Sequence, residues 1–87
     1  MKLIYCEKCG DVISMRFEER SCFCGASKGR YLDSLNAEYS GPAKPLGFHN
    51  THFKSALKNQ PEKGWGKEFT AFVIEKECST FKKKENK

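Results

Sequence analysis

The 87-residue chain lacks any long hydrophobic run, and only 38% of its residues are hydrophobic. No stretch approaches the roughly 20 apolar residues that span a bilayer, and no apolar leader segment precedes the first cysteine at position 6. Paired carboxylates, a Ser/His/Asp set and a phosphate-binding glycine loop are also missing at workable spacing. We therefore expect a cytoplasmic, reducing location, no membrane partner, no small-molecule substrate and no enzymatic activity.

Cysteine, by contrast, is plentiful, with five residues in a small chain. A domain of this size buries a thin core, so it usually needs disulfides, a metal or a partner to hold its fold. An odd number of cysteines fits a fully paired disulfide framework poorly. In a reducing compartment, closely spaced cysteines favour metal binding.

Four of these cysteines form two close pairs, Cys6 with Cys9 and Cys22 with Cys24, and a glycine follows each pair. The segment between the pairs alternates like a strand, which would bring two tight turns together. Four sulfurs at about 2.3 Å from one ion make a closed, structural site. We therefore predict one structural zinc ion held by these four cysteines. Iron is the alternative metal for four sulfurs, and two disulfides are a further alternative, although local closure of either pair would be strained.

The cysteine pattern resembles the zinc-ribbon, or rubredoxin-like, superfamily of two opposed knuckles over residues 3–31. This resemblance implies a ribbon of short strands around a structural zinc ion. The second knuckle, Cys22-Phe23-Cys24, is one residue shorter than the usual Cys-x2-Cys, which argues against a standard rubredoxin. The whole chain is also similar to small uncharacterised proteins of phages and other mobile elements. That similarity assigns no activity, but it implies that the target of a small adaptor or inhibitor could be a host or defence complex.

Strand periodicity and turn residues predict a small α+β fold as a single domain over residues 1–78. We expect a zinc ribbon of three short strands in 1–32 and an extension in 33–78. Near its start, Asp33 or Ser34 is expected to cap a helical turn over 35–38. The following Pro/Gly-rich stretch, 39–48, is predicted to form a loop without a regular element.

The rest of the extension is predicted to contain a helix and a covered strand. Asn50 or Thr51 is expected to cap a helix that ends near Asn59. The run 69–74 is apolar on both faces, which is typical of a central or covered strand. We expect the apolar face of the helix to pack against that strand on the ribbon, and we expect residues 79–87 to form a basic, flexible tail.

The function that we expect first is a zinc-stabilised protein-binding module. It depends on a closed metal site, the missing catalytic set, and apolar residues that could anchor a protein partner, namely Trp65, Phe48 and Phe81. Tryptophan is enriched among interface hot spots, although Trp65 could equally fold back over a thin core.

Nucleic-acid binding is the alternative function. The net charge is +5, and residues 41–87 supply all of it, with ten lysines against five glutamates. Basic and aromatic residues interleaved on a small sheet can neutralise and stack a single strand, although an ordinary solvated surface would look the same. The candidate residues are Arg16, Arg20, Lys28, Arg30, Tyr31, Lys82, Lys83 and Lys84.

Three further residues have open roles. Cys78 is expected to be a small, half-buried hydrophobe, since nothing in the sequence marks it as a nucleophile. His49 and His52 are spaced to chelate a second metal, but they could also line the seam between the helix and the ribbon.

Overall fold

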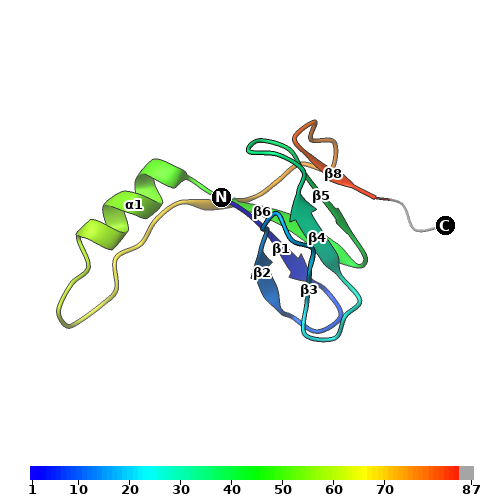
Figure 1. Cartoon of the computed structure of the whole chain (residues 1–87). Coiled ribbons are helices and arrows are strands. Elements are labelled where there is room, and N and C mark those ends of the chain that lie inside the picture. Colours follow the sequence, from blue (N-terminus) through cyan, green and yellow to red (C-terminus); the bar gives the residue numbers. More distant parts are fainter. Residues whose placement is uncertain (85–87) are drawn as a thin grey trace.

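Two four-stranded β-sheets and one helix make up the protein in the computed structural model, which describes residues 1–84 (Figure 1). The elements in chain order are β1 Lys2–Cys6, β2 Val12–Ser14, β3 Arg20–Ser21, β4 Lys28–Tyr31, β5 Ala37–Ser40, β6 Ala43–Phe48, α1 Asn50–Lys58, β7 Ala71–Val73 and β8 Phe81–Lys83. The predicted small α+β class is confirmed.

The first sheet has the strand order β2-β1-β6-β7 and is antiparallel throughout. The predicted loop over 39–48 is wrong, because β6 is a central strand of this sheet. Pro45 is tolerated because it lies just outside the part of β6 that pairs with β7. The Pro45 carbonyl forms a hydrogen bond on the side facing β7, where it accepts from the Ile74 N–H at 2.8 Å. Gly47 leaves room for the Phe72 ring, which a Cβ would approach to 2.8 Å.

The second sheet has the order β3-β4-β5-β8, and its last two strands run parallel. The predicted helical turn over 35–38 is wrong. Asp33 instead closes a tight turn by accepting the N–H groups of Leu35 and Asn36 at 2.8 Å each, and the chain then enters β5. The predicted flexible tail is also wrong over its described part, because β8 forms an edge of the sheet; residues 85–87 lie outside the described residues.

The core lies between the two sheets and draws on both of them. Its buried members are Ile4, Ile13, Met15, Ala37, Tyr39, Ala43 and Phe81. Phe81 is completely buried and meets Tyr39 edge-on, with ring centroids 5.0 Å apart. Cys78 lies half-buried against this core, as expected of a small hydrophobe. The strand β8 therefore completes the core, and we name residues 1–48 and 71–84 together the body.

The remaining residues, 49–70, project from the sheets as an arm that consists of α1 and the segment returning from it (Figure 1). The predicted helix is confirmed, but its N-cap is His49, whose ring nitrogen accepts the His52 N–H at 3.4 Å. The two imidazoles stack with centroids 3.8 Å apart and are exposed, so they do not line a seam with the sheets.

The apolar side of α1 packs within the arm and at its base. Phe48, Phe53 and Phe69 form an aromatic cluster, with ring centroids 5.2, 4.9 and 5.0 Å apart. The predicted packing of the helix against the 69–74 run is present only as the contact of Phe53 with Phe69, and the prediction that the helix packs on the ribbon is wrong, because this contact lies in the arm and Leu57 stays exposed. The run 69–74 is not a covered strand either, since β7 is an edge strand with all three residues exposed.

Candidate metal centre

The first cysteine pair lies in the turn between β1 and β2. Cys6 is the last residue of β1, and Cys9 follows within the turn. The Gly10 N–H closes this turn by donating to the Cys6 carbonyl at 2.8 Å. Gly10 takes a positive φ of 77°, which a residue with a side chain would disfavour. The glycine after the pair is therefore part of the geometry that presents both sulfurs.

The second pair lies in the turn between β3 and β4 and repeats this arrangement. The Gly25 N–H donates to the Cys22 carbonyl at 3.0 Å, and its φ is 79°. The N–H of Phe23 donates to Oδ2 of Asp11 at 2.9 Å, and Asp11 directly follows the first turn. The shorter second knuckle is thus hydrogen-bonded to the first.

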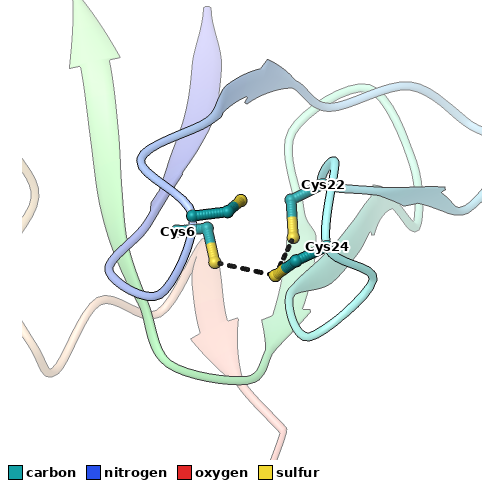
Figure 2. Close-up of side chains that lie close together, drawn as sticks. Cys6, Cys22 and Cys24 are labelled. Atoms are coloured by element: carbon teal, nitrogen blue, oxygen red, sulfur yellow. Dashed lines mark hydrogen bonds between the residues drawn. The ribbon is translucent and has the colours of Figure 1, made fainter.

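The four sulfurs of Cys6, Cys9, Cys22 and Cys24 all lie within 4.8 Å of one another. Figure 2 shows the sulfurs of Cys6, Cys22 and Cys24 directed toward one another, with Cys24 3.8 Å from Cys6 and 3.5 Å from Cys22. A tetrahedron with metal–sulfur bonds of about 2.3 Å has edges of about 3.8 Å. The cluster therefore has the dimensions of a four-thiolate metal site. All five cysteines are free, so the alternative of two disulfides is wrong.

The cysteine thiols differ widely in acidity. The Ser27 hydroxyl is the main cause that lowers the pKa of Cys6, to about 6, against burial, which raises it. Burial raises the pKa of Cys22 as well, but the Ser27 backbone N–H helps to bring it below its ordinary value. For Cys24, the Ala26 backbone N–H lowers the pKa, but burial and the three neighbouring thiols raise it to about 11. Four such groups become thiolates together only when a cation joins them.

The groups of Ser27 that lie beside the cysteine cluster show whether the cluster fits a metal ion. The hydroxyl of Ser27 is completely buried and has no hydrogen-bond partner among the described residues. Its backbone N–H donates to the Cys22 sulfur at 3.4 Å. Donors aimed at sulfur fit thiolates that carry negative charge, as metal-bound cysteines do. The donor set therefore fits a soft or borderline metal ion.

The three candidate partner anchors have different surroundings. Trp65 is 95% exposed on the arm and does not fold back over the core. Phe48 is half-buried in the aromatic cluster at the base of the arm. Phe81 is wrong as a surface anchor, because it lies in the core. The lysines that follow Phe81 in the sequence suggested a solvated tail, and this hid its role.

Four candidate nucleic-acid residues gather on the outer face of the second sheet, and we name them the cationic face: Lys28, Arg30, Lys82 and Lys84. They surround Glu38 on β5. The Arg30 Nε lies 3.5 Å and the Lys84 Nζ 3.6 Å from its Oε2. Lys82 pairs with Glu38 in the strand register, and Lys28 lies two residues before Arg30 on the same face. One carboxylate thus stands among four cations.

The other four candidates lie elsewhere. Arg20 donates through Nη1 to the carbonyl and the hydroxyl of Ser14 at 3.0 Å each. The Tyr31 hydroxyl accepts the Lys2 N–H at 3.1 Å, and its ring packs against the core. Arg16 follows the end of β2, and Lys83 alternates to the opposite side from Lys82. Tyr31 is therefore not positioned to stack bases beside the cationic face.

Sequence reasoning missed Asp11, Ser27 and Glu38. Asp11 could have been noticed as the acidic residue directly after the first knuckle, and Ser27 as a small polar residue two positions after Gly25. No local signal marks Glu38, because its role depends on the pairing of β5 with strands on both sides.

No protein-family model, curated protein or solved structure matches this chain. The zinc-ribbon resemblance therefore depends on the cysteine pattern and on the geometry described above. Within residues 1–84, no helix has the length and apolar character that a membrane crossing requires.

Proposed function

We propose that the four clustered cysteines bind one zinc ion that stabilises the body and takes no part in catalysis. The sulfur–sulfur distances of 3.5 and 3.8 Å and the four-thiol donor set support a tetrahedral metal. Iron competes for the same donors and would make an electron-transfer protein instead. A colourless purified protein with one zinc per chain supports the proposal, and visible absorption from iron contradicts it.

On this scaffold we propose a protein-binding module, not an enzyme, that recognises its partner with the arm. The observation that carries this proposal is a groove of about 440 Å³ between α1 and the returning segment. Leu57 and Trp65 line it and are 61% and 95% exposed, while Phe53 and Phe69 form its more enclosed part. Concave apolar sites with an exposed tryptophan are typical of interface hot spots.

Charge indicates the chemistry of the partner. Lys54 and Lys58 lie on α1, which has no acidic residue, whereas lysines and glutamates balance over 59–70. The arm therefore carries net positive charge around an apolar groove. We propose a partner segment that inserts an apolar side chain and has acidic residues beside it. We propose a host or defence complex as the first place to look for this partner.

The test is photo-crosslinking in native cells from position 65 and, as a matched control, from position 17, an aromatic residue of the body that is 65% exposed. A partner that crosslinks only from position 65, survives nuclease, and binds the purified protein but not Trp65→Ala supports the proposal. A partner that binds Trp65→Ala as tightly as the wild type contradicts it.

Nucleic-acid binding through the cationic face is a second candidate function. Glu38 forms ion pairs with Arg30 and Lys84. Lys28 and Lys82 form no ion pair among the described residues, so their charges remain available to a ligand. Residues two positions apart on a strand, such as Lys28 and Arg30, have backbone positions about 6.6–6.8 Å apart. Such rows suit the phosphates of a backbone more than its bases, so we expect binding without sequence preference.

The test compares two double variants of equal net charge. Lys28→Glu with Lys82→Glu should abolish most binding to a labelled oligonucleotide, whereas Lys54→Glu with Lys58→Glu on the arm should weaken it modestly. The wild-type affinity should fall steeply with salt. An equal loss of oligonucleotide affinity in the two variants, or an affinity that does not change with salt concentration, would count against the cationic face. Charge reversal is preferable to deletion from residue 82 onward, because truncating β8 would disturb its pairing with β5.

A further inference from the structure

Ser27 is the one buried polar residue among residues 1–84, with none of its surface exposed. It lies just after the second knuckle, and two hydrogen bonds tie its backbone to Cys22. The Ser27 carbonyl accepts the Cys22 N–H at 2.9 Å, and the Ser27 N–H donates to the Cys22 sulfur at 3.4 Å. The residue is therefore fixed against the sulfur cluster.

The turn between β5 and β6 lies close against the segment that contains Ser27. Gly41 has a φ of 94°, and a Cβ on it would lie 2.8 Å from the Ser27 Cα. The backbone of that turn therefore packs directly against the 26–27 segment. The hydroxyl cannot turn to solvent, because the whole residue is enclosed.

A buried hydroxyl without a partner destabilises a fold, so an acceptor for it must be sought among the adjacent groups. Its backbone N–H already donates to the Cys22 sulfur, which holds the hydroxyl beside the cysteine cluster, and no described group accepts from the hydroxyl. A neutral thiol is a weak acceptor, whereas a metal-bound thiolate is a charged and stronger one.

We propose that the Ser27 hydroxyl donates a hydrogen bond to a cysteine thiolate of the metal centre, in addition to the bond that the Ser27 backbone N–H donates to the Cys22 sulfur. This inference depends on the proposed zinc site. Four thiolates around one divalent ion carry a net charge of −2, and donors directed at the sulfurs stabilise that charge. Ser27 is thus a supporting donor that retains the metal, and not a ligand.

The two interpretations of Ser27 predict opposite effects of the Ser27→Ala substitution. If the hydroxyl is only a buried group without a partner, its removal leaves zinc affinity unchanged or improves it. If it supports a cysteine thiolate of the cluster, zinc affinity falls by roughly 10–100-fold. The charge-transfer band of the cobalt-substituted protein should then shift to lower energy, because the sulfur becomes more electron-rich.

The experiment measures zinc affinity against a chromophoric chelator and the cobalt spectrum for the wild type, Ser27→Ala and the control Ser21→Ala, an exposed serine of β3. In the cadmium-113 wild type, the Ser27 hydroxyl proton should exchange slowly and show coupling to the metal, which needs no variant to fold. Unchanged affinity and spectrum in Ser27→Ala, or a hydroxyl proton that exchanges at the solvent rate, would overturn the inference. A wild type that binds no metal at all would instead overturn the zinc site.

Discussion

The body encloses a core of buried residues from both sheets beside the cysteine cluster, whereas Ala56 is the one buried residue of the arm. The arm keeps its form through the aromatic cluster at its base and the cap of α1. Large exposed apolar side chains, Leu57 and Trp65 among them, remain on the arm. Stability is therefore concentrated in the body, and surface available for recognition is concentrated in the arm.

The largest expected effect is the loss of one metal ligand from the body. In Cys9→Ser we expect loss of zinc and unfolding of the body, because structural zinc supplies on the order of 10–16 kcal/mol in finger peptides, against about 5–15 kcal/mol for the whole stability of a domain. Metal content and a thermal melt followed by circular dichroism measure this. Cys78→Ser, outside the cluster, is the control, and an unchanged melt with full zinc occupancy in Cys9→Ser would refute the site.

Acid should separate the body from its metal. The fold lowers the pKa of Cys6 from 9.0 to about 6, so stability from this thiolate is complete above pH 9 and is lost as the pH falls through about 6. The pKa of Cys24 is raised to about 11, so at neutral pH a metal must displace its proton. We expect zinc release, read with a chromophoric indicator, as acid protonates the cysteine thiolates. Extra zinc should move the midpoint to lower pH, and a midpoint independent of zinc concentration would contradict competition between metal and protons.

The core offers a direct comparison with the arm. Phe81→Ala should lower the free energy of unfolding by about 3–5 kcal/mol, because it empties a fully enclosed site. Trp65→Ala removes a larger side chain that is 95% exposed, so its effect should stay within about 0.5 kcal/mol. Urea denaturation at saturating zinc measures both, and similar losses in the two variants would show that the arm contributes to stability as the body does.

A smaller effect is expected from backbone geometry. Gly41→Ala should cost about 1–3 kcal/mol for its positive φ alone, and more because the new Cβ would collide with the Ala26 carbonyl oxygen. Gly66→Ala on the arm meets no atom within 4 Å and should be close to neutral. Thermal melts of the two variants check this pair. Equal melting temperatures would mean that the backbone of residues 26–27 can shift to accommodate the new Cβ at little cost in stability.

The cysteine set and the helix could be predicted from the sequence because both depend on local signals. Two cysteines and a glycine define each turn, and capping residues and apolar spacing define α1. Residues close in sequence supply nearly everything that these features need, so one short window contains their pattern.

The strands β6 and β8 could not be predicted because their pairing is long-range. Pro45 and Gly47 locally favour a loop, and only pairing of β6 with β1 and β7 makes that segment a strand. Phe81 precedes three lysines that locally indicate a solvated end, yet Ala37 is its partner across the sheet. The four residues of the cationic face were predicted as candidates, but their gathering around Glu38 was not, since it depends on the pairing of β5 with β4 and β8.

The parallel pairing of β8 with β5 also sets the order of events during synthesis. Both cysteine turns leave the ribosome before β8 and can capture metal there, but Phe81 reaches Ala37 only after translation has passed β8. A nascent chain stalled before that point would hold zinc between two turns over an open hydrophobic surface. Such chains would be natural clients of ribosome-associated chaperones.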